Sequence, residues 1–282
     1  MEVAVFVAVL AAAACHAGWN AVIKGGGDPL VTTAIVTIAA GAVGLPFWPF
    51  VGLPNAEAWP WVAASVAVHL VYFASLIEAY RHGDLGQVYP IARGGAPLMT
   101  GVASTLLIGE ELSVPAWSGL LLLVAGVLLL SLPGGHALAR FNWRGIGYAL
   151  ATAVTICAYT IVDGIGARAS GNPASYTFAI FAGASLVMAG YLLARRGFAA
   201  ALAGSRPQWR IGLFGGALQV ASYGVAIWAM TVAPIAIVAA LRETSVLFGA
   251  LIAVVLLKEP LHATRLVAAL LIVAGLVALR VG

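Results

Sequence analysis

The sequence predicts an all-α integral membrane protein whose ten transmembrane helices form two inverted five-helix repeats. Its composition predicts the membrane, because 62% of the 282 residues are hydrophobic and only 9% are charged, whereas a soluble domain carries about 25% charged residues. An internal repeat predicts the duplication: residues 88–130 align without a gap on residues 237–279, at an offset of 149 residues and with 11 identities in 43 positions. Similarity at one fixed spacing indicates a repeated structural unit.

Ten segments are long and apolar enough to cross a bilayer, which takes roughly 20 residues of helix. Short stretches rich in glycine and proline separate them, and none alternates in polarity as a barrel strand does. We expect a first repeat at residues 1–135 and a second, inverted repeat at 141–282, together forming one integrated transport domain. The predicted helices cover residues 3–23, 30–53, 59–80, 86–108, 115–132, 143–165, 174–193, 209–230, 234–257 and 263–280.

The number of helices in each copy sets the relative orientation of the copies. Each repeat crosses the membrane five times, and five is odd, so the two copies run through the bilayer in opposite senses. Inverted repeats of this kind enclose a central binding site in secondary transporters. The architecture therefore predicts a transporter of small molecules in a lipid bilayer, and the scattered charges predict no nucleic-acid partner.

Positive charges are distributed unequally between the two sets of loops. One side carries only Arg168 and Arg280, and the other carries ten basic residues. Because cytoplasmic loops carry the excess of Lys and Arg, we expect the ten-residue side in the cytoplasm and both termini outside. The ten are Lys24, Arg81, Arg140, Arg144, Arg195, Arg196, Arg206, Arg210, Lys258 and Arg265.

Small residues recur at helical spacing in the fourth and ninth predicted helices. Spacing of this kind lets two helix backbones approach closely in lipid. We expect these two helices to pack along their stripes, near the pseudo-two-fold axis. The stripes are Ala96, Thr100 and Ser104 in one helix, and Ser245, Gly249 and Ala253 in the other.

Arg93 and Arg242 occupy equivalent positions on the same faces. An intramembrane arginine is by default a candidate for function, but duplication at a packing seam favours a structural role, in which each arginine bonds exposed carbonyls or a carboxylate such as Glu243. Direct contact with substrate is the alternative. Glu110 and Glu259, also equivalent, precede new helices, and we expect both to favour the positive ends of those helices.

Four other helices carry polar side chains along one face. Polar groups that face lipid are costly unless paired, so these faces should converge on a shared aqueous cavity; for any single residue the alternative is an interhelical hydrogen bond. The faces are His16, Asn20 and Lys24; His69, Tyr72, Phe73, Leu76 and Tyr80; Thr152, Thr155, Tyr159 and Asp163; and Gln219, Tyr223 and Met230.

A cavity that mixes aromatic rings with a few polar groups suits a small amphipathic metabolite. We expect the head of a zwitterion to bond Asn20, His16 or Gln219, and its side chain to rest on tyrosine rings. The expected substrate-binding residues are His16, Asn20, His69, Tyr72, Tyr80, Tyr159, Gln219 and Tyr223.

Titratable groups within or at the edge of the membrane are candidates for proton relay, and the sequence does not choose among them. It holds no P-loop and no motif of a zinc protease or serine hydrolase. We therefore expect no enzyme activity, no cofactor and no metal site, and transport that is passive or coupled to a gradient. The titratable candidates are Asp163, Glu78, Glu243, His16 and His69.

Short motifs in both halves resemble those of a known family. They are Trp19-Asn20 with Lys24, Gly109-Glu110-Glu111-Leu112 before Val124-Ala125-Gly126, and Lys258-Glu259-Pro260-Leu261 before Val273-Ala274-Gly275. With these, nearly the whole chain resembles the drug/metabolite transporter superfamily, of the ten-helix EamA type, and is similar to the YddG amino-acid exporters. The resemblance implies export of amino acids, aromatic ones included, across a bacterial inner membrane.

The resemblance leaves alternatives open. Within the class they are export of drugs, sugars or nucleotide derivatives, and outside it a channel or an intramembrane enzyme; a carrier saturates with substrate, whereas a channel hardly does. Many relatives begin with basic residues and place the N-terminus in the cytoplasm, whereas this chain begins Met1-Glu2. We expect a monomer.

Overall fold

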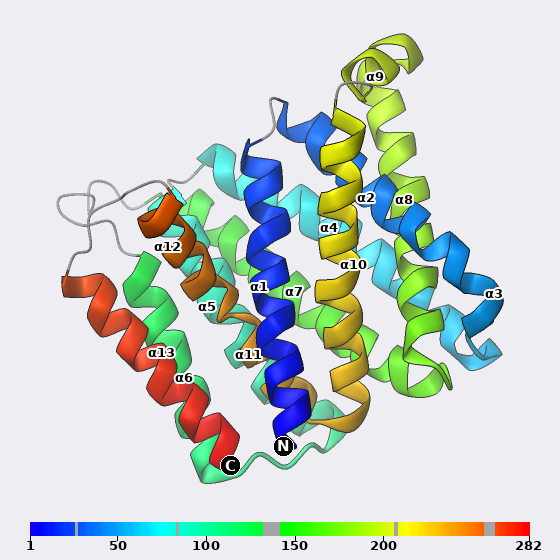
Figure 1. Ribbon diagram of the computed structural model, residues 1–282. Coiled ribbons are helices and arrows are strands. Elements are labelled where there is room, and N and C mark those ends of the chain that lie inside the picture. The colour runs from blue at the N-terminus through cyan, green and yellow to red at the C-terminus, as the bar shows by residue number, and fades with distance from the viewer. Residues whose placement is uncertain (26–27, 83–84, 132–141, 206–207, 257–262) are drawn as a thin grey trace.

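The structure is a computed structural model, and it describes residues 1–25, 28–82, 85–131, 142–205, 208–256 and 263–282. These residues form one helical bundle with both termini at the same end (Figure 1). We name that end the terminal face, and the opposite end, where α9 lies, the basic face. In chain order the elements are α1 (Val3–Gly25), α2 (Pro29–Gly44), η1 (Leu45–Phe47), α3 (Trp48–Val51), η2 (Ala56–Ala58), α4 (Trp59–His82), α5 (Leu85–Ala103), η3 (Ser104–Ile108), α6 (Val114–Ser131), α7 (Trp143–Ala169), α8 (Pro173–Arg196), α9 (Phe198–Ser205), α10 (Trp209–Val232), α11 (Ile235–Arg242), α12 (Ser245–Leu256) and α13 (Ala263–Val281).

Among the described residues, the ten expected helices correspond to nine spans and one shorter helix. Nine helical stretches have the length and hydropathy that crossing a membrane requires, and the apolar helix Val114–Leu130, in α6, is the shorter one. The second expected helix continues through η1 into α3, and the ninth is divided into α11 and α12. The all-α membrane fold is therefore confirmed, with a break in the ninth span that the apolar pattern did not indicate.

Several helices begin at side-chain caps that lie in the breaks of the apolar pattern. Asp28 Oδ1 accepts the N–H of Leu30 at 2.9 Å, and Asn172 Oδ1 accepts the N–H of Ala174 at 3.0 Å. Such caps satisfy donors that a helix leaves unpaired at its start. Asp28 also pairs with Arg196 at the end of α8, so one residue starts α2 and joins it to α8 at the basic face.

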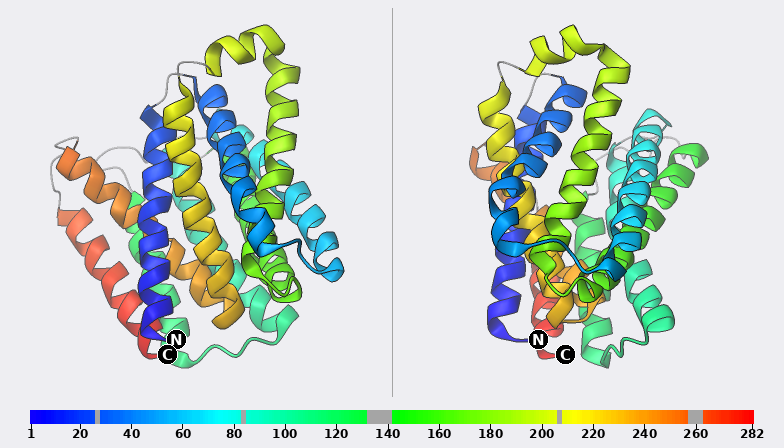
Figure 2. Two further views of the ribbon diagram at one scale, coloured as in Figure 1. Left: turned by 45° about the vertical axis from the view of Figure 1, so that its right-hand side comes forward. Right: turned by 90° about the vertical axis from the view of Figure 1, so that its right-hand side faces the viewer.

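α6 and α13 lie side by side (Figures 1 and 2) and meet in backbone contact through small residues. A Cβ added at Gly275 would lie 2.8 Å from the carbonyl oxygen of Gly119, and one at Gly126 would lie 2.8 Å from the carbonyl oxygen of Ala268. Helices approach this closely in a membrane only where side chains are small. We name Gly119, Gly126, Ala268 and Gly275 the glycine seam.

The pairing across the glycine seam reveals the symmetry of the protein. At the 149-residue offset Gly119 corresponds to Ala268, and Gly126 to Gly275. Gly119 contacts Gly275, which is the counterpart of Gly126, and Gly126 contacts Ala268, which is the counterpart of Gly119. Two antiparallel helices related by a two-fold axis between them make this exchange of contacts. The five-helix repeats are inverted about an axis in the membrane plane.

The seam forms where the sequence did not lead us to expect it. α5 packs mainly on α7, α6 and α11, and α12 packs mainly on α1. A Cβ at Gly249 would meet no atom of the described residues within 4 Å, so the expected packing along the small-residue stripes is wrong at Gly249. α5 meets the ninth predicted helix at α11 and at Ser245 instead. Thr100 and Ser104 are buried, and their hydroxyls donate to carbonyls of their own helix. Ala253 lies outside the described side chains.

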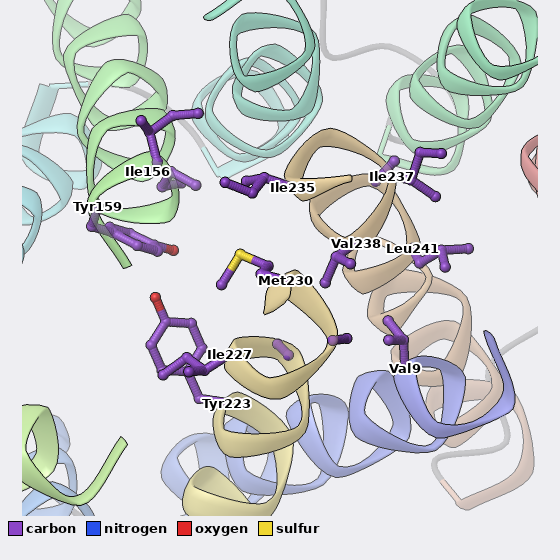
Figure 3. Close-up of a cluster of buried hydrophobic side chains, with 14 of the residues drawn as sticks. Val9, Ile156, Tyr159, Tyr223, Ile227, Met230, Ile235, Ile237, Val238 and Leu241 are labelled. Carbon is purple, nitrogen blue, oxygen red and sulfur yellow. The ribbon is translucent and has the colours of Figure 1, made fainter. Parts of the chain in front are cut away.

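The largest buried apolar cluster joins the two repeats. It includes Val9 of α1, Ile156 of α7, Ile227 of α10 and Leu241 of α11 (Figure 3). Helices of both repeats therefore share one core, and this core surrounds the polar groups described next.

Candidate functional site

Aromatic rings from three helices gather around His69 of α4. The ring of Tyr159 stacks on His69, with centroids 4.4 Å apart and an interplanar angle of 22°. Tyr72 and Tyr223 meet His69 edge-on, with centroids at 6.5 Å and 6.2 Å. We name His69, Tyr72, Tyr159 and Tyr223 the ring cluster. Tyr159 and Tyr223 extend from α7 and α10 into the space between these helices, beside Met230 (Figure 3).

Asp163 lies fully buried one turn beyond Tyr159 on α7. Its carboxyl group accepts hydrogen bonds from the hydroxyls of Tyr223 and, at 3.1 Å, Tyr176. The hydroxyl of Tyr176 occupies the place that a Cβ at Gly166 would take, so a glycine is needed there for this contact. A buried carboxyl group requires such donors, because leaving it without partners in an apolar interior is costly.

The imidazole of His69 has one nitrogen already engaged. Its Nδ1 lies 2.8 Å from the carbonyl oxygen of Ser65, one turn earlier on α4. A carbonyl oxygen only accepts, so Nδ1 must carry a proton. In the neutral ring Nε2, on the far side, is then the nitrogen that can accept a hydrogen bond.

The two intramembrane arginines have different partners. Arg93 Nε lies 3.0 Å from Glu243 Oε2, and Arg93 Nη2 donates to Ser245 Oγ at 3.3 Å. The expected contact with Glu243 is therefore confirmed for Arg93. Arg242 lies over the ring of Tyr223, with its Cζ 4.7 Å from the ring centroid.

A small pocket lies between α5, α7 and α11, and both arginines line it. Glu243 and Tyr159 connect it to the Arg93 ion pair and to the ring cluster. Its lining consists of Arg93, Ala96, Pro97, Thr100, Ile156, Tyr159, Thr160, Ala239, Arg242 and Glu243. Ala96 and Thr100 of the α5 stripe thus line this pocket, and residues of α7 and α11 line its other sides.

A second polar contact joins the repeats near the terminal face. Arg168 at the end of α7 lies 2.6 Å from Glu110, and its Nε donates to the carbonyl oxygen of Met230 at 2.9 Å. The other carboxylate oxygen of Glu110 accepts the N–H of Ile235, at the start of α11, at 2.8 Å. Glu110 therefore caps a helix of the opposite repeat, and the expectation that it serves the helix after it is wrong. Glu259 lies outside the described residues. We name Glu110 and Arg168 the terminal clamp.

The structure brings together some of the expected site residues and separates others. The members of the ring cluster meet one another and reach Asp163 and Arg242. Asn20 is exposed, and its side-chain amide donates to the carbonyl oxygen of His16. The rings of His16 and Trp19 meet edge-on, with their centroids 5.0 Å apart. Gln219 Oε1 is buried without a hydrogen-bond partner among the described residues.

Other expected residues fall away from the centre. Glu78 pairs with Arg81 at 2.9 Å near the end of α4. The side chains of Tyr80 and Lys24 lie outside those that the structure describes. Sequence reasoning missed Tyr176 and the terminal clamp; the buried Asp163 was the available signal for Tyr176, since its carboxyl group needs donors from a neighbouring helix.

Comparison with known proteins agrees with this architecture. The sequence model of the EamA-like transporter family matches this chain twice, at residues 3–132 and at residues 143–281. A solved crystal structure of a protein covers 97% of this chain and 94% of its own at a TM-score of 0.72 and 20% identity, which shows a shared fold.

Two curated relatives match a shorter part of the chain. The Spermidine export protein MdtI of Klebsiella pneumoniae is 37% identical over 68 residues, 24% of this chain and 62% of its own length. The Multidrug resistance protein EbrB of Bacillus subtilis is 32% identical over 81 residues, 29% of this chain and 68% of its own.

Proposed function

The chain belongs to the EamA-like transporter family, and from that membership we propose that it exports amino acids, aromatic ones included, or related small metabolites. The observation that carries the proposal is the contact at Tyr223, whose ring faces a guanidinium and whose hydroxyl donates to a buried carboxyl group. One aromatic side chain thus links a positive group to a hydrogen-bonding carboxyl group inside an apolar core.

An aromatic amino acid has groups that match these in chemistry. Its carboxylate suits a guanidinium, with which it forms two parallel hydrogen bonds. Its ammonium group suits the Asp163 carboxyl group or the faces of the tyrosine rings. Its side chain suits the ring cluster, where aromatic pairs gain about 0.5–1.5 kcal/mol beyond the burial of their area.

The arrangement of the repeats supports alternating access as the mechanism. Inverted repeats exchange conformations by rocking about a central site. The terminal clamp joins α7, α10 and α11 at one end of the bundle, and it is a bond that must open for release there. We propose that the terminal face is external, so that this opening is the export step.

The orientation is tested separately. A tag fused to Met1 or Gly282 should react with membrane-impermeant reagents applied to intact bacterial cells. Protection of both tags would place the terminal face in the cytoplasm and reverse the proposed direction of the clamp.

A second candidate cargo is an organic cation, because Asp163 is a buried carboxyl group near aromatic rings. Rings and a carboxyl group together suit ammonium groups. The two curated relatives are a spermidine exporter and a multidrug resistance protein, which gives this candidate further support. Arg93 and Arg242 in the adjoining pocket oppose it.

The decisive experiment is a substrate panel in reconstituted vesicles, run with and without a pH gradient. We expect saturable transport of phenylalanine, tyrosine or tryptophan that exceeds transport of spermidine. Preferential transport of cations would select the second candidate, and a flux that does not saturate would indicate a channel.

A further inference from the structure

The two equivalent arginines differ in their ion pairing among the described residues. Arg93 is paired with Glu243 and Ser245 of the opposite repeat. Arg242 meets the ring of Tyr223, and its Nε is buried with no hydrogen-bond acceptor among the described residues. Two guanidinium groups thus lie in the centre, and in the part of the chain that the structure describes only that of Arg93 pairs with a carboxylate.

The geometry of Arg242 suits it to take up an acceptor. A guanidinium that stacks on an aromatic ring uses its flat face, whereas its N–H groups lie in its plane and point outward. Stacking therefore leaves the donor edge available and limits the rotation of the side chain. A buried donor without an acceptor carries a desolvation penalty, and a ligand carboxylate would remove it.

We propose that Arg242 binds the carboxylate of the transported molecule, and that Arg93 is a positioning residue that holds Glu243. The inference rests on the proposed function, because it assigns one group of the cargo to one residue of the same site.

The charged side chains that line the pocket favour a monoanionic ligand. Arg93, Arg242 and Glu243 line one pocket, and two cations with one carboxylate leave a single positive charge. A monoanionic carboxylate neutralises that charge, whereas a phosphate dianion would exceed it. In a low-dielectric interior an unbalanced charge is strongly disfavoured.

Three compounds that share a phenyl ring separate the contributions of the cargo. Phenylalanine carries both a carboxylate and an ammonium group, 3-phenylpropionate carries only the carboxylate, and phenylethylamine carries only the ammonium group. Each is measured in vesicles that contain the wild type, Arg242→Gln, Arg242→Lys or the control Arg144→Gln. Arg144 is exposed near the start of α7, outside the pocket.

We expect Arg242→Gln to lower transport of phenylalanine and of 3-phenylpropionate on the order of ten- to a hundred-fold, the loss that a charge-assisted pair implies. Transport of phenylethylamine should not fall. The variant should therefore lose the preference of the wild type for compounds that carry a carboxylate. Arg242→Lys keeps the charge but lacks the planar fork of donors. Its transport of both carboxylates should be several-fold lower than that of the wild type. Arg144→Gln should match the wild type.

Each other outcome is informative. Undiminished transport of phenylalanine in Arg242→Gln overturns the inference and leaves the proposed function standing. Arginine-dependent transport of 3-phenylpropionate without transport of phenylalanine supports the inference and contradicts amino-acid export. Transport of phenylethylamine alone, or of none of the three by the wild type, overturns both. If Arg242→Gln does not yield monodisperse protein, Arg242→Lys decides, and unchanged carboxylate transport in that variant overturns the inference.

Discussion

The glycine seam and the polar centre preserve the duplication to different degrees. In the seam, equivalent positions make equivalent contacts, and Gly126 and Gly275 are the same residue in both copies. In the centre, Arg93 and Arg242 are equivalent, but Glu243 corresponds to Gly94, which packs against Leu128 instead. Backbone contact imposes one geometric demand on both helices, so it selects small residues in both copies.

The cargo that we propose would account for the asymmetry of the centre. Asp163, Tyr159, Tyr223 and Arg242 all belong to the second repeat, and His69 of the first repeat packs against them. A cargo whose ends differ in charge cannot be matched by two identical half-sites. We infer that divergence after duplication built the site on a scaffold that stayed symmetric.

Breaking the seam should have the largest effect. Gly275→Leu puts a branched side chain where even a Cβ would lie 2.7 Å from the backbone nitrogen of Leu123. α6 and α13 must then separate, so we expect the loss of most folded protein, measured as monodisperse yield on size-exclusion chromatography. Gly249→Leu is the matched control, because its Cβ would meet no atom within 4 Å among the residues that the structure describes. Equal yields for the two variants would contradict the seam.

Breaking the Arg93 ion pair should come next. Arg93→Gln leaves Glu243 buried without its cationic partner, and a broken buried pair costs about 3–5 kcal/mol. We expect a lower midpoint of thermal unfolding, and Arg93→Gln with Glu243→Gln should recover much of the loss. A double variant no more stable than Arg93→Gln alone would show that the pairing is not what stabilises this contact.

Tyr176 is a part of the polar centre that only the structure revealed. Tyr176→Phe removes one donor from Asp163, and we expect a loss of about 1–3 kcal/mol in the free energy of unfolding, the cost of leaving a buried acceptor without a donor. Tyr191→Phe on the same helix is the control, because Tyr191 is 40% exposed and its ring meets the guanidinium group of Arg195. Equal stability of both variants would mean that Asp163 does not depend on Tyr176.

Much of the architecture follows from local patterns. Apolar runs, glycine- and proline-rich breaks and the constant offset predicted the all-α fold and the repeats, because lipid demands continuous helices. The place of the seam did not follow, because both stripes and seam contain small residues at helical spacing, and only the packing of whole helices selects between them.

The candidate site was predictable where its residues lie on a polar face of one helix. The ring cluster and Asp163 lie on such faces, and the structure brings them together. Tyr176 and the cap that Glu110 gives to α11 depend on contacts between helices far apart in the chain, for which the sequence carries no local signal.

The terminal clamp should produce a smaller effect on stability than the buried pair, since Arg168 is 35% exposed and exposed ion pairs contribute about 0–1 kcal/mol. Its expected effect is on conformation: Arg168→Gln should raise the reactivity of a cysteine placed at Met230 toward a hydrophilic thiol reagent. The readout uses a Met230→Cys background from which Cys15 and Cys157 have been removed. Unchanged reactivity would show that the terminal clamp does not control access of water-soluble reagents to the centre.

Asn20→Ala should have the smallest effect of all. The side chain is exposed and bonds the carbonyl oxygen of His16 on its own helix at 2.7 Å, so its removal leaves the ring cluster and both arginines as they are. Exposed substitutions away from buried contacts change the free energy of unfolding by less than about 0.5 kcal/mol. We therefore expect a folded variant whose transport rate is within about two-fold of that of the wild type. Tyr223→Ala is its counterpart, because it removes the ring under Arg242 and a donor to Asp163. If Asn20→Ala lowered transport as much as Tyr223→Ala, the site would extend along α1 to the basic face, and the centre would be only its inner part.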